Sequence, residues 1–312
     1  MKSASMSEEP QTAATVLMVR PASFGFHAEA AASNAFASDS KDADAQAAAE
    51  REFDAAAEAL DRAGIEVLIL EDRREPPRPD AVFPNNWVSF HADGTMVLYP
   101  MATAARRLER NAEAVRSLVA SAGYKVSRTI DLSALESDGH FLEGTGSLVL
   151  DRPARRAFAN LSPRTSAEAI ALFDEKLGFD TTVFDARDRA GRPIYHTNVL
   201  LSLGTSFAVL CADAVAAEQR DALRDAVGSS GRTLIQVDYD QMRGFACNLL
   251  ELRGSGGPVI ALSSAARRSF RADQLRLLER FGLLVEADIP TIERIGGGSL
   301  RCMIAEVHLP RN

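Results

Sequence analysis

Pairs of short apolar segments recur along the chain, and a longer segment with apolar residues at helical spacing follows each pair. Turn sequences such as Ala92-Asp93-Gly94 separate the two members of a pair, which is typical of β-hairpins. The predicted hairpins pair residues 82–90 with 95–99, 141–150 with 156–159, 195–203 with 206–210, and 245–252 with 258–262, and a single strand is predicted at 300–307.

The segments between the hairpins predict helices, each followed by one more short strand. In the first of them, Phe53, Ala57 and Leu60 recur at the spacing of a helix face. The predicted helices cover residues 45–63, 105–121, 166–177, 214–227 and 264–281. The strands that follow them are predicted at 66–70, 125–127, 181–184, 233–237 and 284–286.

The hairpins form an internal repeat. Measured from Phe83, Phe141, Tyr195, Phe245 and Leu300, the intervals are 58, 54, 50 and 55 residues. A period of this length indicates a repeated supersecondary unit in a solenoid or a propeller. Since no linker interrupts the repeats, we expect one α/β domain over residues 13–312, with five units in a ring. The alternative is two α/β domains whose similarity is accidental. Residues 1–12 are mostly polar and are expected to form a disordered tail.

Composition restricts the classes of function. The net charge of -8 argues against a nucleic-acid partner, and no apolar run is long enough for a membrane helix. The chain shows no signal-peptide pattern, and its three cysteines lack metal-ligand spacing, so we expect a cytoplasmic protein with free thiols and no bound metal. A homo-oligomer is left open.

Chemically reactive or polar residues lie at the start of each predicted hairpin, where a five-fold ring would bring them together. A cysteine, a histidine and a carboxylate are the components of nucleophilic catalysis by a thiol. Cys302 follows three consecutive glycines, which favours a tight loop that a substrate can approach. Cys247 is a rival nucleophile, and burial as a small apolar residue is the alternative for either cysteine. The residues at the hairpin starts are Asn85, Asn86, Glu143, His196, Asn198, Cys247 and Cys302.

The order of these motifs resembles the pentein, or guanidino-group-modifying, superfamily, over residues 16–310. The branch that it resembles most is that of the citrulline-utilisation hydrolases. The resemblance implies a five-bladed, pseudo-symmetric α/β propeller that acts on a small amino-acid substrate without a cofactor. The motifs are RPASFGF at 20–26, FPNNW at 83–87, LEGTG at 142–146, SPRT at 162–165, HTN at 196–198 and GGGSLRC at 296–302.

The resemblance also implies individual roles. Cys302 resembles the family nucleophile, His196 its general acid and base, and Glu143 the partner of the histidine. Asn86 and Asn34 match positions that contact the substrate. Arg164 and Arg106 resemble arginines that hold the substrate carboxylate.

Three departures from the family bear on the substrate. Deiminases have aspartates where this chain has Asn86 and Asn198, and a third acidic position corresponds here to Gly146 or Ser147. A guanidinium group has only donors and pairs best with carboxylates, whereas a ureido group also presents a carbonyl oxygen that an amide can bind. The sequence therefore predicts a citrulline hydrolase that releases ornithine, ammonia and carbon dioxide through a covalent Cys302 intermediate.

Three other functions remain open. An arginine dihydrolase or deiminase would use the same fold on a guanidino substrate, since dihydrolases of the family also carry asparagine at the position of Asn86. An amidinotransferase would need an amine acceptor in place of water. A catalytically silent propeller would be a binding module, but it would have no reason to keep cysteine, histidine and glutamate together.

Overall fold

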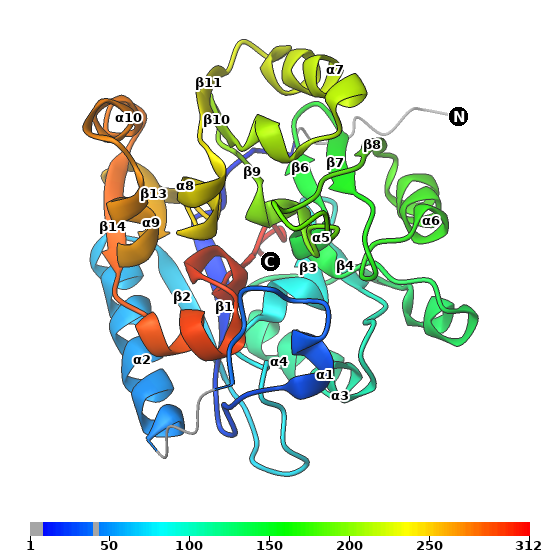
Figure 1. Cartoon of the computed structure of the whole chain (residues 1–312). Coiled ribbons are helices and arrows are strands. Elements are labelled where there is room, and N and C mark those ends of the chain that lie inside the picture. The colour runs from blue at the N-terminus through cyan, green and yellow to red at the C-terminus, as the bar shows by residue number, and fades with distance from the viewer. Residues whose placement is uncertain (1–8, 40–43) are drawn as a thin grey trace, which may run out of the picture.

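The computed structural model describes residues 9–39 and 44–312, which form five three-stranded sheets arranged in a ring (Figure 1). In each sheet the central strand is antiparallel to one neighbour and parallel to the other. The colours in Figure 1 follow the ring in chain order, with the longer helices on the outside. The predicted five-bladed α/β propeller is therefore confirmed.

Each sheet is one blade. The first is β15 (Ala305–Glu306), β1 (Thr15–Arg20) and β2 (Glu66–Glu71); the second is β3 (Val88–Phe90), β4 (Thr95–Leu98) and β5 (Arg128–Asp131). The third is β6 (Val149–Asp151), β7 (Arg156–Asn160) and β8 (Asp180–Phe184). The fourth is β9 (Leu201–Leu203), β10 (Phe207–Leu210) and β11 (Thr233–Gln236), and the fifth is β12 (Leu250–Gly254), β13 (Gly257–Ser263) and β14 (Leu283–Ala287).

The α-helices lie between the strands in sequence. They are α1 (Ala28–Ala31), α2 (Ala45–Arg62), α3 (Ala104–Arg107), α4 (Ala112–Ser121), α5 (Gly144–Ser147), α6 (Ala167–Leu177), α7 (Ala217–Gly228), α8 (Tyr239–Arg243), α9 (Ser264–Ser269) and α10 (Ala272–Leu278). Short helical turns of other types are η1 (Pro84–Asn86), η2 (Ser133–Asp138), η3 (Thr197–Val199), η4 (Ala212–Ala214), η5 (Ile292–Gly296) and η6 (Leu300–Met303).

Helix α2 shows how the sequence pattern places the outer layer. Its alanines favour the helical state, and Ala49, Phe53 and Leu60 are fully buried on one face. The opposite face carries exposed charged residues such as Arg62, which pairs with Glu58 one turn earlier. The helix therefore packs its apolar stripe against the sheets, as its periodicity predicts.

Two predicted helices are each divided in the structure. The segment 105–121 forms α3 and α4, because the Asn111 side chain accepts a hydrogen bond from the Ala114 amide and starts a new helix. The segment 264–281 forms α9 and α10, and the Gln274 side chain accepts from the backbone amide of Arg271 at the start of the second helix. In both cases a side-chain cap overrides the continuous periodicity.

The hairpin starts also differ from the prediction in a way that matters for function. Residues expected at the beginning of a strand lie in the short helical turns η1, α5, η3 and η6, and the paired strands begin only after them. Four blades therefore present their reactive residues on a turn that projects beyond the sheet.

The expected disordered tail at 1–12 is wrong for residues 9–12, while residues 1–8 lie outside the described part of the chain. Glu9 is buried, and its carboxylate pairs with Arg152 at 2.5 Å and Arg155 at 3.0 Å. Burial alone would raise the pKa of Glu9, but Arg152 and His91 hold that pKa well below its usual range. Specific ion pairs thus order this polar segment, a cause that composition does not reveal.

Candidate active site

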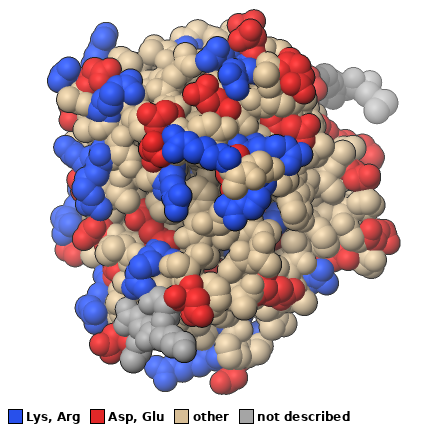
Figure 2. Space-filling view, viewed as in Figure 1, with Lys and Arg blue, Asp and Glu red and all other residues tan. Residues whose placement is uncertain are grey.

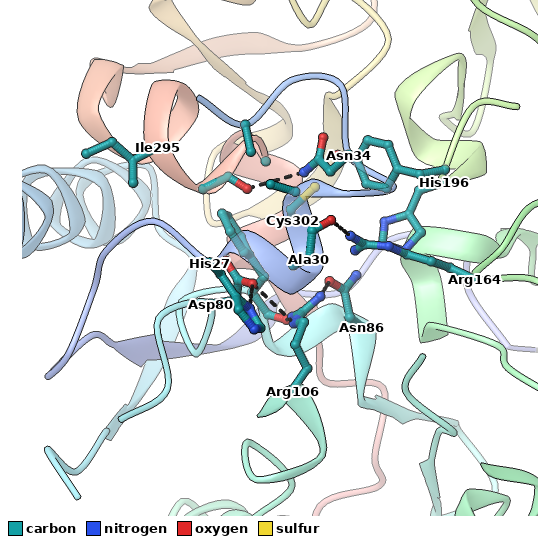
Figure 3. A pocket seen from close by; sticks show the side chains of 16 residues that line it. His27, Ala30, Asn34, Asp80, Asn86, Arg106, Arg164, His196, Ile295 and Cys302 are labelled. Atoms are coloured by element: carbon teal, nitrogen blue, oxygen red, sulfur yellow. Dashed lines mark hydrogen bonds and ion pairs between the residues drawn. The ribbon is translucent and has the colours of Figure 1, made fainter. Parts of the chain in front are cut away.

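Segments that lie far apart in the sequence meet at one pocket (Figure 3). Cys302 and His196 of the expected catalytic set line it, while Glu143 lies behind His196 and is hydrogen-bonded to it. Asn34 and Asn86 also line the pocket, and Asn198 contacts the sulfur of Cys302. Cys302 comes from η6, His196 immediately precedes η3, and Glu143 immediately precedes α5. The residues that line the pocket include His27, Asn34, Asp80, Asn86, Arg106, Arg164, His196 and Cys302.

The sulfur of Cys302 lies within reach of two amide side chains. The thiol is 3% exposed, and its Sγ accepts from Asn248 Nδ2 at 3.3 Å and from Asn198 Nδ2 at 3.5 Å. N–H donors aimed at a sulfur stabilise the thiolate form, which is the nucleophile. The two amides can therefore support the negative charge that Cys302 carries when it is deprotonated.

The glycine loop before Cys302 allows the chain to pass close to its neighbours. Gly297 has a φ of +66°, and a Cβ there would lie 2.6 Å from Asn34 Nδ2. The Asn34 side chain uses this space to donate to the carbonyls of Gly296 and Gly297, both at 3.3 Å. Asn34 thus lines the pocket and ties the segment after α1 to the loop that leads to Cys302.

His196 and Glu143 form a buried pair. The His196 Nε2 and Glu143 Oε2 atoms are 2.8 Å apart, and neither side chain is exposed to solvent. Burial lowers the pKa of His196 to about 4, although Glu143 acts to raise it. The imidazole is therefore neutral at physiological pH and is ready to accept a proton. Its ring also packs 4.6 Å from the ring of Tyr195.

Glu143 is kept ionised by cations on its other side. Arg164 Nη1 donates to Glu143 Oε2 at 3.2 Å, and Arg106 Nη1 lies 3.6 Å from the same oxygen. Burial would raise the pKa of Glu143, but Arg164 and His196 hold it well below its usual range. The carboxylate can therefore orient the imidazole and stabilise its charged form during turnover.

Both arginines that were expected to hold a substrate carboxylate already bind protein groups. Arg164 also donates to Ser33 Oγ at 2.8 Å and to the carbonyl of Ala30 at 2.6 Å. Arg106 binds both carboxylate oxygens of Glu109, each at 2.9 Å, and donates to Asn86 Oδ1 at 2.7 Å. The two guanidinium groups line the pocket, but their observed contacts hold Glu143, Asn86 and the α1 segment.

Asn86 is fixed in a defined orientation. Arg106 holds its oxygen, and its Nδ2 donates to Asn85 Oδ1 at 3.0 Å. A Cβ added at Gly146 would lie 2.6 Å from Asn86 Nδ2 and 2.7 Å from His196 Nδ1. Gly146 therefore provides the space that both side chains occupy.

Two residues of the site, Asn248 and Asp80, were not predicted from the sequence. Asn248 was overlooked in favour of its neighbour Cys247, which is fully buried in a hydrophobic cluster, where burial raises its pKa well above the usual value. Cys247 is therefore a core residue. The other omission is Asp80, whose Oδ2 lies 2.7 Å from His27 Nδ1. This hydrogen bond, against the effect of burial, raises the pKa of His27.

A signal for Asn248 was present in the repeat. An asparagine stands three residues after the aromatic residue at the start of three hairpins, at positions 86, 198 and 248. No comparable pattern marks Asp80 or His27. Among the described residues, no group of three or more His, Cys, Asp or Glu side chains could hold a metal ion. The same residues include no helix of the length and apolarity that would cross a membrane.

The sequence matches one protein family over most of its length. The family model described as N,N-dimethylarginine dimethylhydrolase, eukaryotic, matches residues 20–309. No curated protein sequence matches the chain.

Similar solved structures share the fold at low sequence identity. ArgZ, an arginine dihydrolase from the ornithine-ammonia cycle in cyanobacteria, has a TM-score of 0.74 and 16% identity over 96% of this chain and 41% of its own. AgrE in complex with ornithine and NAD+ has a TM-score of 0.73 and 17% identity over 96% of this chain and 40% of its own. The chain thus spans about two fifths of these two proteins. DDAH from Pseudomonas aeruginosa, a cysteine-to-serine mutant complexed with citrulline, has a TM-score of 0.67 and 15% identity over 94% of this chain and 99% of its own.

Proposed function

We propose that this chain, which belongs to the N,N-dimethylarginine dimethylhydrolase family of the guanidino-group-modifying superfamily, hydrolyses the carbon–nitrogen bonds of a ureido amino acid, with citrulline as its substrate. The observation that carries this proposal is that Cys302 and His196 line one pocket, with Glu143 hydrogen-bonded to His196 and an amide side chain hydrogen-bonded to the sulfur of Cys302. The products would be ornithine, ammonia and carbon dioxide.

The first half of the reaction forms a covalent intermediate. The Cys302 thiol attacks the ureido carbon as its proton passes to neutral His196, and a carbon–sulfur bond forms. Glu143 stabilises the resulting imidazolium. His196 then gives the proton to the departing nitrogen of ornithine, whose bond to the carbon breaks, and a carbamoyl group remains on the sulfur.

The second half uses water. Neutral His196 takes a proton from a water molecule, whose oxygen attacks the carbamoyl carbon, and the carbon–sulfur bond then breaks. The proton returns to the sulfur, and the carbamic acid that leaves decomposes to ammonia and carbon dioxide. Asn198 and Asn248 donate to the sulfur as it departs with negative charge.

The charges around the pocket support a neutral reacting group. The carboxylates in and behind the pocket already have partners: Glu143 faces Arg164, and Asp80 lies 2.7 Å from His27 Nδ1 and 3.8 Å from Arg106 Nε. A guanidinium would bring a further positive charge without an uncommitted carboxylate to receive it. Asn198 Oδ1 is buried and has no hydrogen-bond partner among the described residues, so it can accept an N–H of the substrate, which ureido and guanidino groups both offer.

A guanidino substrate is the second candidate, and Asp80 is the observation that favours it. Its carboxylate lines the same pocket, and deprotonation of His27 would leave it with less positive charge nearby. An arginine dihydrolase or deiminase activity would then use the same cysteine and histidine.

A substrate panel distinguishes these reactions. The purified protein is incubated separately with citrulline, arginine and N,N-dimethylarginine, and ornithine, citrulline and ammonia are measured. Ornithine and ammonia from citrulline support the proposal, while citrulline that accumulates from arginine or dimethylarginine would contradict it. Cys302→Ser should abolish turnover, and Cys247→Ser is the matched control that should retain it. Full activity of the Cys302→Ser protein would exclude the mechanism.

A further inference from the structure

A second cavity of about 670 Å³ lies against the catalytic pocket. Ala31 and Tyr195 line both spaces, so the two share a wall. The face shown in Figure 2 is hollowed near its centre, and Lys and Arg side chains border the hollow. We name this space, bounded by residues of the 31–36, 188–195 and 239–245 segments, the outer cavity. Its size is typical of a small-molecule site.

The floor of the outer cavity is apolar and aromatic. Phe36 lies between two other rings, with centroid distances of 6.2 Å to Tyr195 and 5.2 Å to Phe245, and Met242 and Ile194 also line the floor. Phe245 has a φ of +66°, a conformation that side-chain-bearing residues rarely adopt and that occurs preferentially at ligand sites. This floor suits a flat or apolar group.

The carboxylates of the outer cavity are all engaged. Asp188 pairs with Arg192 at 2.7 Å, and Asp240 pairs with Arg189 at 2.6 Å. Glu293 accepts from Ser299 Oγ at 2.7 Å, and burial raises its pKa. A substrate ammonium group would therefore find no free carboxylate among the described residues that line this space.

Arg243 is available for an anionic ligand in the outer cavity. Arg243, at the end of α8, makes no hydrogen bond or ion pair within 4 Å in the described part of the chain, and it lines the outer cavity. Guanidinium groups bind carboxylates in a bidentate manner. The polar chemistry of the outer cavity therefore favours a carboxylate.

The catalytic pocket is too small for a whole amino acid. Its free volume of about 20 Å³ is close to the space that one or two water molecules occupy. A substrate that reacts at Cys302 therefore needs further space, and the outer cavity on the other side of Ala31 and Tyr195 is a neighbouring space large enough for its remainder.

We propose that the outer cavity binds the non-reacting half of the substrate, and that the preferred substrate carries an apolar or aromatic acyl group on its α-nitrogen. Acylation removes the ammonium charge, the acyl group packs on Phe36 and Phe245, and the α-carboxylate pairs with Arg243. This inference rests on the proposed hydrolysis of a ureido group, and it narrows the substrate class from free citrulline to an α-N-acylated form.

The test compares citrulline, Nα-acetylcitrulline and Nα-benzoylcitrulline as substrates, with ammonia release as the readout. We expect kcat/KM for the benzoyl compound to exceed that for citrulline at least ten-fold, with the acetyl compound between them. Arg243→Ala should lower the ratio of benzoyl to free citrulline at least five-fold, and Arg243→Lys should restore part of it. Arg62→Ala, which removes an equally accessible arginine on α2, is the control and should leave the ratio unchanged. Equal kcat/KM values for all three compounds would overturn the inference while leaving the proposed hydrolysis intact.

A binding measurement keeps the inference testable if no compound is turned over. Calorimetric titration of the Cys302→Ala protein with Nα-benzoylcitrulline should show binding at least ten-fold tighter than citrulline, and Arg243→Ala should remove that advantage. Failure of turnover with tight binding of the benzoyl compound would refute the proposed reaction alone. Absence of tighter binding would refute the role of the outer cavity.

Discussion

Replacing Glu143 with glutamine tests whether this carboxylate acts in the chemistry as well as in the fold. The substitution keeps the shape of the side chain and removes its charge. Glu143 Oε2 lies 2.8 Å from His196 Nε2 and 3.2 Å from Arg164 Nη1. The glutamine variant therefore loses an acceptor that supports an imidazolium, and it leaves the buried Arg164 without its carboxylate.

The size of the effect follows from these contacts. Loss of one partner in a buried charge pair costs about 3–5 kcal/mol of folding stability. A positioned acid–base pair contributes about 100- to 10,000-fold to rate, so kcat should fall by a factor in that range. Glutamine cannot stabilise the protonated imidazole, so the pKa of His196 should fall below its present value of about 4.

Glu109→Gln is the matched control. Glu109 is also buried and binds Arg106 through both oxygens, but it makes no hydrogen bond to His196 in the described structure. Thermal unfolding should show that both variants lose stability, while initial rates of ammonia release, measured well below both Tm values, should collapse far more for Glu143→Gln. Equal losses of kcat in the two variants would show that Glu143 matters only through folding, and the reasoning would be refuted.

Five further outcomes follow from the site and its surroundings. Asn248→Ala should lower kcat/KM about ten- to hundred-fold and slow alkylation of Cys302 by iodoacetamide at neutral pH, because the sulfur loses an N–H donor. Gly146→Ala should lower kcat about a hundred-fold, as its Cβ would displace His196; an unchanged rate would mean that the ring can shift freely. The acidic limb of the kcat/KM profile should lie near pH 4, since His196 remains neutral above that pH. The unfolded chain binds a proton at His196 near pH 6.5, whereas the folded chain binds it only near pH 4. Denaturant unfolding should therefore show that this group lowers the free energy of unfolding by about 3 kcal/mol as the pH falls from about 6.5 to 4. Glu9→Gln should lower the free energy of unfolding by about 3 kcal/mol, because a buried arginine loses its anion, and the activity of the folded protein should persist.

The periodicity of the sequence predicted five repeated units, and the structure contains five blades in that order. Four apolar pairs, one single strand and five helical stripes carried this prediction, while β1, the central strand of the first blade, was not predicted. These signals are strong because each blade must bury its own sheet face and helix stripe, which fixes the spacing of apolar residues. The divisions at Asn111 and at Arg271 were not predicted, since a side-chain cap changes the local hydrogen bonding without altering the apolar pattern.

The candidate site was predicted in part. Cys302, His196 and Glu143 were found because each has a reactive side chain at a repeated position. Asn248 was missed because a cysteine next to it attracted the functional interpretation, although the spacing from Phe245 favoured the asparagine.

Asp80 lies outside the repeated motifs, and only the folded chain brings it to His27. The observed partners of Arg164 could not be deduced either, since pairing with Glu143 depends on packing between blades.

Asn198 lies beside the nucleophile Cys302, and its lack of charge affects which substrate charge the site can accept. Its Nδ2 lies 3.5 Å from the sulfur of Cys302, where a carboxylate would oppose the developing thiolate. A carboxylate at this position would be tolerable only if a cationic guanidinium accompanied it in the same buried space. An amide donates to the sulfur without that requirement, and its free Oδ1 can accept from an uncharged substrate. The amide can thus stabilise the thiolate while an uncharged reacting group is bound. For this physical reason the residue beside the cysteine bears on the choice between ureido and guanidino substrates.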